Sequence, residues 1–184
     1  MAQFLSKICA RIIQDKLTLQ ITQKVMSIFT EFSEVTKDLY LSSAFAIKDE
    51  VLKEHDIYLV INATKELPLW PPSGPPVFDV IRVPLVDSSI QDAYKYFEDV
   101  SNLIKKHSED SKKTLIHCAA GVSRSACLAV AYLMRHHNMP LEEALTKLKM
   151  VRPAVKPNNG FVHQLTRWQD ECNKLRAGDE RIEH

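Results

Sequence analysis

The segment from Lys112 to Asn138 constrains the fold of this chain most strongly, because three distinct patterns follow one another without a break. The run "KKTLIHC" (residues 112–118) has the composition of a strand. The small-residue stretch "AAGVS" follows it, and residues 124–138 are then apolar almost all round, which indicates a buried helix. The sequence therefore predicts a strand, a tight loop and a helix at the centre of a domain.

Strand and helix patterns alternate along most of the remaining chain. Residues 57–64, "IYLVINAT", form a nearly continuous apolar run, which is typical of a strand covered on both faces. The other predicted strands are residues 38–42 and 80–85, and the other predicted helices are residues 46–56, 93–106, 141–151 and a last helix near Phe161. This order predicts an α/β fold with a central, mainly parallel (mixed) sheet of about four to five strands and helices on both faces.

The same patterns divide the chain into three parts. Residues 33–176 are predicted to form one folded domain, and residues 177–184 a flexible tail. Residues 1–32 are predicted to be an extension, with a helical apolar face at residues 4–13 and a strand-like alternation at residues 17–21. This extension either packs on the domain or acts as a targeting or partner-binding segment.

The stretch "LPLWPPSGPPVFD" (residues 67–79) is predicted to be a loop, because five prolines and a glycine interrupt any regular structure. Trp70 lies within it. That tryptophan either pins a surface connection or acts as a docking feature.

Composition and charge exclude several classes of function. The net charge is +1 and the pI is about 7.7, so bulk charge recruits neither nucleic acid nor a membrane surface. No apolar run is long enough for stable membrane insertion, and no secretory signal is apparent. The cysteines stand at positions 9, 118, 127 and 172 without CxxC spacing, which argues against a zinc cluster and a disulfide framework. The sequence therefore predicts a reducing compartment, the cytoplasm first, with the nucleus or mitochondrion as alternatives.

The predicted loop between strand and helix has the chemistry of an anion-binding site. Backbone N–H groups of such a loop point into one small space, and the first turn of the helix adds unpaired donors and the positive end of its dipole. Gly121 permits a backbone angle that other residues resist. The same donors would lower the pKa of the Cys118 thiol, and the planar side chain of Arg124 can bind two phosphate oxygens at once. The loop therefore predicts a phosphoryl-transfer site.

The stretch "HCAAGVSRSA" (residues 117–126) resembles the signature loop of the cysteine-dependent protein phosphatases, and of their dual-specificity branch in particular. A cysteine or an arginine alone would be unremarkable, but six specified positions coincide here. Further matches are "AYLM" (131–134), "RPAVKPNNGFVHQL" (152–165), "VINAT" (60–64) and "VPLVDSSIQDAYKYF" (83–97). The resemblance spans roughly residues 35–173 and is closest to small atypical members that consist of a catalytic domain alone.

The resemblance implies a role for each residue of this stretch. Cys118 would attack phosphorus and form a phosphocysteine intermediate, and Ser125 would hydrogen-bond the sulfur as it departs. Arg124 and the backbone N–H groups of the preceding loop residues would hold the phosphoryl oxygens; these are Ala119, Ala120, Gly121, Val122 and Ser123. His117 would brace the backbone of the cysteine. No metal or other cofactor is needed, since the nucleophile is ionised without one.

A general acid is needed as well, because an alkoxide or phenolate leaves poorly without a proton. Asp87 falls where the family carries this acid and would act as the base for water in the second step. Asp92 is the rival carboxylate, but it is better placed to cap the helix that follows. Asn158 and Asn159 are predicted to cap the last helix, and one of them, Asn158 by preference, to support the loop.

The low pKa also makes Cys118 the side chain most prone to oxidation. Cys127, inside the following helix, is predicted to be a core residue rather than a partner for an oxidised Cys118.

The loop also narrows the class of substrate. The resemblance implies that phosphoinositide phosphatases of the superfamily carry lysines at loop positions that are uncharged here, and that the RNA-directed branch usually has Asn where this chain has Ser123. A shallow pocket would admit phosphoserine, phosphothreonine and phosphotyrosine. The sequence therefore predicts a dual-specificity phosphoprotein phosphatase, with kinases of signalling pathways among its candidate substrates. The alternatives are a phospho-binding scaffold with little turnover and a phosphatase of a lipid or glycan substrate.

Overall fold

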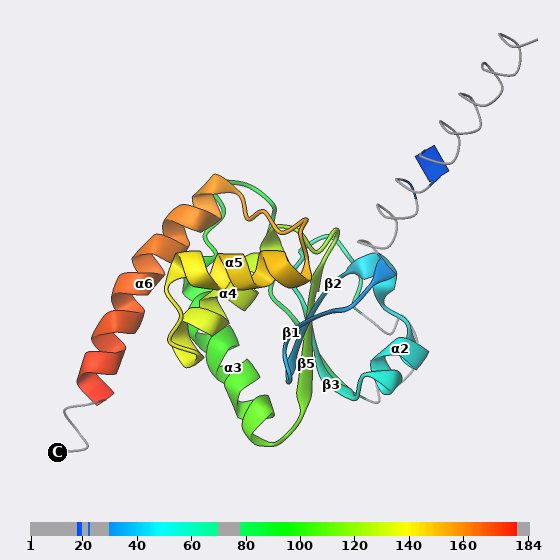
Figure 1. The fold of residues 1–184 in the computed structure, drawn as a ribbon, viewed down its shortest axis with the longest axis horizontal. Helices are drawn as coiled ribbons and strands as arrows, with labels where there is room; N and C mark the ends of the chain where they lie inside the picture. Colours follow the sequence, from blue (N-terminus) through cyan, green and yellow to red (C-terminus); the bar gives the residue numbers. More distant parts are fainter. Residues whose placement is uncertain (1–17, 20–21, 23–29, 70–77, 180–184) are drawn as a thin grey trace, which may run out of the picture.

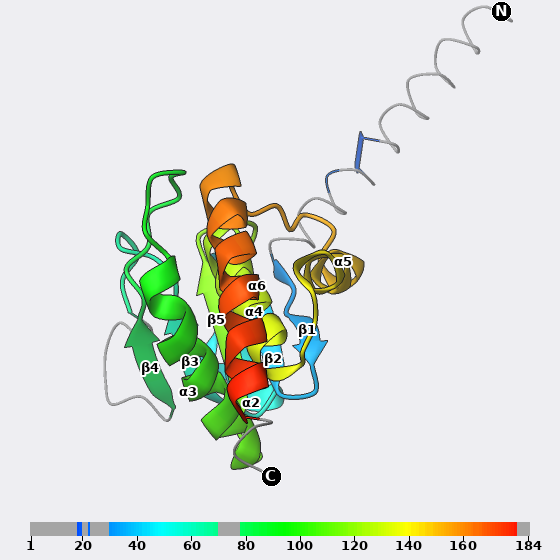
Figure 2. The same ribbon diagram turned by 90° about the vertical axis from the view of Figure 1, so that its left-hand side faces the viewer.

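A five-stranded sheet with the strand order β1-β2-β5-β3-β4 forms the centre of the computed structural model, which describes residues 18–19, 22, 30–69 and 78–179. The strands are β1 (Ser33–Thr36), β2 (Leu39–Ser43), β3 (Ile57–Asn62), β4 (Asp79–Arg82) and β5 (Lys113–Cys118). β1 pairs with β2 in antiparallel orientation, whereas the other neighbours are parallel (Figure 2). The predicted mainly parallel, mixed sheet is confirmed.

Helices cover both faces of this sheet, as predicted. The helices are η1 (Ala44–Ala46), α2 (Asp49–Glu54), η2 (Tyr94–Tyr96), α3 (Phe97–Glu109), α4 (Arg124–His136), α5 (Leu141–Val151) and α6 (Asn159–Asp179). Figure 1 shows α2 on one side of the sheet and α3 to α6 on the other. Among the described residues, no helix combines the length and the apolar character that a membrane span requires.

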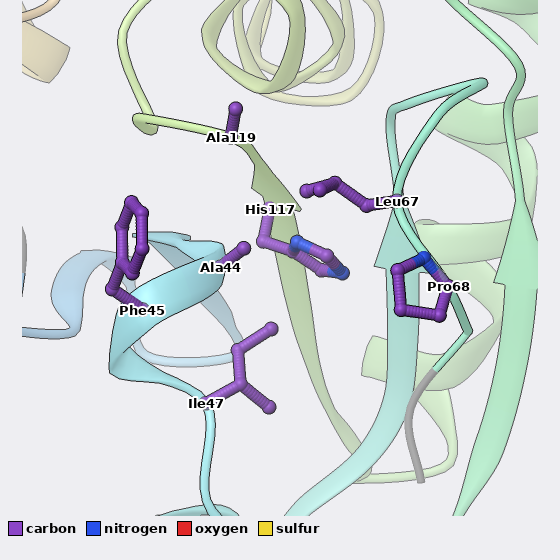
Figure 3. Close-up of a pocket in the computed structure, with 7 residues that line it drawn as sticks. All are labelled: Ala44, Phe45, Ile47, Leu67, Pro68, His117 and Ala119. Carbon is purple, nitrogen blue, oxygen red and sulfur yellow. The ribbon is translucent and has the colours of Figure 1, made fainter. Parts of the chain in front are cut away.

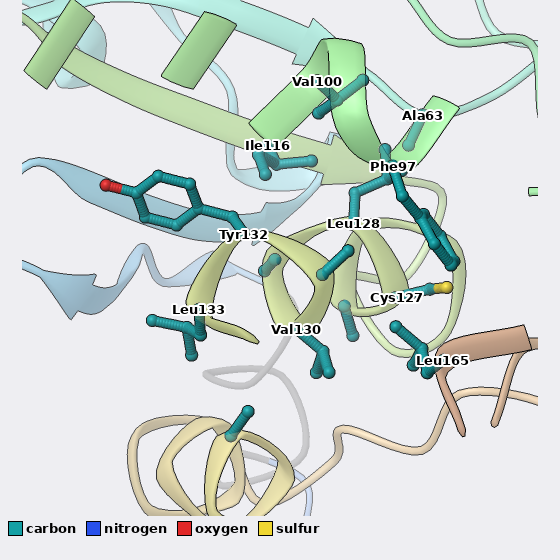
Figure 4. Close-up of a cluster of buried hydrophobic side chains, with 14 of the residues drawn as sticks. Ala63, Phe97, Val100, Ile116, Cys127, Leu128, Val130, Tyr132, Leu133 and Leu165 are labelled. Carbon is teal, nitrogen blue, oxygen red and sulfur yellow. The ribbon is translucent and has the colours of Figure 1, made fainter. Parts of the chain in front are cut away.

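The main hydrophobic core is built around α4. Every residue of this helix from Arg124 to Met134 is buried, which is why its sequence is apolar on all sides. Leu128 points toward Phe97 of α3, whereas Val130 lies on the opposite side of α4, away from the sheet (Figure 4). From α6, the indole N–H of Trp168 donates to the carbonyl of Ala131 at 3.1 Å. α4 is therefore held from several directions, and its first turn, which follows β5 and the loop, is fixed with it.

Two predicted helices begin differently in the structure. Residues 46–56 do not form one helix, because Ile47 and Lys48 have extended backbone angles between η1 and α2. The predicted helix at 93–106 begins with the short 3₁₀ turn η2 and extends to Glu109. Asp92 does not cap it, so that prediction is wrong. The side chain of Gln164, from α6, instead accepts the backbone N–H groups of residues 93 and 94, both at 2.8 Å.

Other differences lie near the ends of the chain. β1 is absent from the predicted strands, because Val35 is the only apolar residue among its four. The strand-like structure predicted from the alternation at residues 17–21 is wrong at the described residues of that stretch, since Thr18 and Leu19 are helical. α6 continues to Asp179, past the predicted start of the tail at residue 177. Trp70 and the apolar face at residues 4–13 lie outside the described residues.

We expect Leu128→Ala to lower the free energy of unfolding by about 2–5 kcal/mol, because a fully buried side chain would leave a cavity in this core. Met150→Ala is the matched control, since that side chain is 80% exposed and its loss should change stability by less than about 0.5 kcal/mol. Urea unfolding of the two variants measures both effects. Equal losses of stability in the two variants would contradict this account of the core.

Candidate active site

Each carbonyl group of the loop Ala119–Ser123, between β5 and α4, accepts a hydrogen bond from outside the loop. The backbone N–H of Ala44 donates to the carbonyl of Ala119 at 3.3 Å, and the side chain of Arg152 donates to the carbonyls of Ala120 (3.0 Å) and Gly121 (2.8 Å). The carbonyls of Val122 and Ser123 accept from the backbone N–H groups of Lys156 and Cys127, both at 2.9 Å. The N–H and C=O of one peptide unit point in opposite directions. Fixing the carbonyls outward therefore directs the amides of the loop toward its interior.

Arg152 is the functional residue that the sequence analysis left without a role. Its guanidinium is almost fully buried and donates to four acceptors: the carbonyls of Gly121, Ala120 and Glu31 and the hydroxyl of Ser33. Burial lowers its pKa, whereas the nearby Cys118 and Glu31 raise it. A lysine could not serve the same set, because only the planar fork of arginine spans several acceptors. Arg152 thus ties the loop to β1 with a positive charge.

Gly121 has the positive backbone angle that the sequence led us to expect, with φ = 68°. A Cβ atom at this position would lie 2.6 Å from the carbonyl oxygen of Ser42 and 2.7 Å from the guanidinium of Arg152. Both distances are shorter than van der Waals contact. Glycine is therefore required here for its backbone angle and for its lack of a side chain.

The thiol of Cys118 lies inside this ring of amides and is buried. The backbone N–H of Gly121 donates to its Sγ at 3.2 Å, and the hydroxyl of Ser125 donates to it at 3.1 Å. Burial alone would raise the pKa of Cys118, but the hydrogen bonds from the Ser125 side chain and from the N–H groups of Ser125, Val122 and Gly121 outweigh it. The pKa is therefore lowered. The predicted position of Ser125 beside the sulfur agrees with this geometry.

Arg124 is the first residue of α4, and its side chain is bonded to two groups outside the loop. Its Nη1 donates to the carboxylate of Glu66 at 2.5 Å and to the carbonyl of Leu85 at 3.3 Å, while its Nε is buried without a partner among the described residues. Burial would raise the pKa of Glu66, but the bond from Arg124 lowers it overall. Glu66 is a second residue that the sequence analysis missed, because it lies 58 positions away in an irregular segment.

Asp87 lies against the same loop. Its Oδ1 accepts hydrogen bonds from the hydroxyl of Ser123 at 2.7 Å and from the side-chain amide of Asn158 at 2.8 Å. Asn158 also caps α6, since its Oδ1 accepts the N–H of Phe161 at 3.0 Å. Asn159 is the first residue of that helix, so it is Asn158 that both caps α6 and contacts Asp87 beside the loop. A network of three side chains thus joins Asp87 to the loop and to α6.

His117 and Cys127 are two further buried side chains from the same strand–loop–helix segment as Cys118. Burial lowers the pKa of His117 to about 4, with Arg82 acting in the same direction and the Cys118 backbone against it. Among the described residues, neither ring nitrogen of His117 has a hydrogen-bond partner within normal distance and angle limits. The predicted role of His117, to brace the backbone of Cys118, therefore stays a prediction. Cys127 is fully buried within the core of α4, as predicted, and burial raises its pKa. That Cys127 does not act as a partner for an oxidised Cys118 stays a prediction.

The entrance to the site is an open cleft of about 590 Å³, lined by Lys65, Glu66, Val86, Asp87 and Arg124. Its lining includes carboxylates and the buried guanidinium of Arg124, and the Cys118 thiol of lowered pKa lies inside the loop that precedes Arg124. A carboxylate, a guanidinium and a thiolate are the groups needed to transfer a phosphoryl group through sulfur. The fold and this cleft together define the class of cysteine-dependent phosphatases.

Comparison with known proteins gives the family within that class. Residues 39–171 match the family model described as dual specificity phosphatase, catalytic domain. Human dual specificity protein phosphatase 21 is 38% identical over 139 residues, which cover 75% of this chain and 72% of that protein. This chain therefore belongs to the dual specificity phosphatases, phosphoprotein phosphatases that use a cysteine nucleophile, pass through a phosphocysteine and need no metal.

Solved structures share the fold. A mouse putative dual specificity phosphatase complexed with zinc tungstate has a TM-score of 0.75 and 30% identity, covering 80% of this chain and 91% of its own. The human tyrosine phosphatase-like serine/threonine/tyrosine-interacting protein has a TM-score of 0.70 and 25% identity, covering 77% of this chain and 97% of its own.

We expect Arg152→Met to lower the free energy of unfolding by at least about 2 kcal/mol, because it leaves the buried carbonyls of Ala120 and Gly121 without a donor. Vanadate, a phosphate-like oxyanion, should also bind at least about tenfold more weakly once the loop is free to turn. Arg152→Lys is the matched variant, since it keeps the charge but reaches fewer acceptors, and it should recover only part of either loss. Wild-type stability and vanadate affinity in Arg152→Met would contradict this role.

Proposed function

We propose that Cys118 attacks the phosphorus of a phosphorylated serine, threonine or tyrosine side chain of a protein. The new S–P bond forms as the bond from phosphorus to the side-chain oxygen breaks. The loop amides and Arg124 stabilise the charge on the transferring group. The observation that carries this proposal is the set of five outward-bonded carbonyls around a thiol of lowered pKa.

Arg124 holds the phosphoryl oxygens with the part of its side chain that the protein leaves unused. The bond to Glu66 occupies Nη1, and the buried Nε lacks a partner among the described residues. A bound phosphoryl group supplies that partner. The contact with Glu66 thus orients the guanidinium before substrate arrives, which lowers the cost of ordering it on binding.

Asp87 is the general acid of the first step and the general base of the second. The bonds from Ser123 and Asn158 both reach its Oδ1, which leaves Oδ2 to carry the proton to the leaving oxygen. In the second step Asp87 takes a proton from water as the water attacks phosphorus and the P–S bond breaks. Ser125, whose hydroxyl already donates to Sγ, stabilises the departing thiolate.

Phosphoproteins are the proposed substrates, and signalling kinases are candidates among them. The loop side chains Ala119 to Ser123 carry no charge, which suits one phosphoryl group better than a polyanionic lipid head group. The complex of the mouse relative with zinc tungstate, an oxyanion salt, supports an oxyanion site in this family. We further propose residues 33–176 as the catalytic unit. The free state of Cys118, Cys127 and Cys172 supports a reducing compartment such as the cytoplasm.

The first experiment compares wild type with Cys118→Ser on three substrates: para-nitrophenyl phosphate, phosphopeptides and phosphoinositides. We expect wild type to hydrolyse the first two and Cys118→Ser to lose both activities while still binding phosphopeptides, because the nucleophile is lost but the amides remain. Phosphoinositide turnover that exceeds phosphopeptide turnover would favour a lipid substrate. Binding without turnover in wild type would favour a scaffold.

We expect Asp87→Asn to lower kcat on phosphothreonine peptides by about 10²–10⁴-fold, because their alkoxide leaving group needs a proton. The loss should be smaller on para-nitrophenyl phosphate, whose leaving group is already a stable anion. Asp92→Asn is the matched control and should stay near wild type. The reverse pattern between these two variants would move the acid role to Asp92.

A further inference from the structure

A second cavity adjoins the 119–123 loop on the face of the sheet that also carries α2. Its volume is about 270 Å³, and its lining residues come from η1, from the segment after β3 and from the end of β5 (Figure 3). They are Ala44, Phe45, Ile47, Leu67, Pro68, His117 and Ala119. Ala119 is the first residue of the loop that surrounds the Cys118 sulfur, so this cavity and the active site share a wall.

No charged side chain is among the described residues that line the cavity. Six of the seven lining residues are apolar, and His117 is uncharged at neutral pH because its burial disfavours the protonated ring. A charged group placed here would lose its water without gaining an ionic partner, which is costly. The cavity therefore suits an apolar occupant.

The size of the cavity fits one large side chain. An engineered apolar cavity of about 150 Å³ is already large enough to bind benzene. At about 270 Å³, this cavity accommodates a leucyl, methionyl or phenyl group but not a folded element.

The rim of the cavity is also exposed and apolar. The side chain of Phe45, in the short helix η1, is 73% exposed beside the cavity. The N–H of Ala44 donates to the carbonyl of Ala119, so η1 is fixed against the loop. A phosphoresidue bound over Cys118 continues into a peptide on both sides, and each further residue extends about 3.3–3.6 Å. A neighbour of the phosphoresidue therefore comes within reach of this cavity.

We propose that this cavity is a specificity subsite for a large apolar side chain within two residues of the phosphorylated residue of a protein substrate. The proposal rests on the phosphoprotein phosphatase function proposed above and adds a sequence preference to it. Phe45 forms the exposed wall of the subsite, and burial of the substrate side chain there lowers KM.

The test uses a host phosphotyrosine peptide with serine at the two positions before and the two positions after the phosphotyrosine. Leucine replaces each serine in turn, and kcat/KM is measured for every peptide with the full-length protein. We expect leucine at one of these positions to raise kcat/KM by about tenfold, since burial of a few methylene groups gives discrimination of this size. Hydrolysis of para-nitrophenyl phosphate, which has no neighbouring residue, normalises each variant.

Ala44→Leu fills the cavity and should remove the preference for leucine. Ile90→Ala is the matched control, because Ile90 is an apolar side chain that is 92% exposed on the segment that carries Asp87, outside the cavity lining. It should keep the preference. Should Ala44→Leu fail to fold, Phe45→Ala provides the second variant, since loss of the exposed wall should reduce the preference at least threefold.

Equal kcat/KM for all peptides in wild type would overturn the subsite and leave the proposed function standing. A preference that survives Ala44→Leu but disappears in Ile90→Ala would overturn it too, by placing the contact on the Asp87 segment. A dimer of wild type that Ala44→Leu dissociates, without any peptide preference, would assign the cavity to a second copy of the chain. Turnover of para-nitrophenyl phosphate without turnover of any phosphopeptide would overturn the subsite together with the proposed substrate class.

Discussion

The outward anchoring of the loop carbonyls is the constraint on which the rest of the site depends. Five consecutive peptide units would not hold their amides in one direction unaided, because each would gain by pairing with the protein or with water instead. The anchors come from η1, from Arg152, from Lys156 and from α4 itself. Elements far apart in the chain thus contact one short loop. By fixing the direction of its amides, they together favour the thiolate form of the Cys118 sulfur at its centre.

This arrangement concentrates buried charge in a small volume. Arg124, which follows the 119–123 loop, and Arg152, which donates to its carbonyls, are both buried, and burial of such groups costs free energy unless they are paired. Arg152 is satisfied by carbonyls and a hydroxyl, and therefore acts as a fixed support. Arg124 bonds to Glu66 and Leu85, and its Nε has no hydrogen-bond partner among the described residues. The site is thereby prepared for an anion of the right shape.

Local patterns were sufficient to predict the centre of the fold and the position of Ser125 beside the Cys118 sulfur. β5, the loop and α4 are contiguous in sequence, so the strand pattern, the small residues and the apolar helix predict them together, and the parallel sheet follows from the alternation of elements. Long-range partners could not be predicted in this way. Arg152, Glu66 and Gln164 act on groups 31 or more positions away, and no pattern in their own segments shows which distant groups they contact. β1 was missed for a related reason, since its pairing with β2 rather than its composition makes it a strand.

Titration of the Cys118 thiol by its rate of alkylation tests the central claim most directly. The rate of reaction with iodoacetamide is followed against pH in wild type, and Cys118→Ser supplies the background from the other three cysteines, Cys9, Cys127 and Cys172. The account predicts an ionisation midpoint below that of an ordinary cysteine, because the amides and Ser125 favour the thiolate more than burial disfavours it. A midpoint at or above the ordinary value would contradict it, since the loop would then fail to stabilise negative charge at its centre.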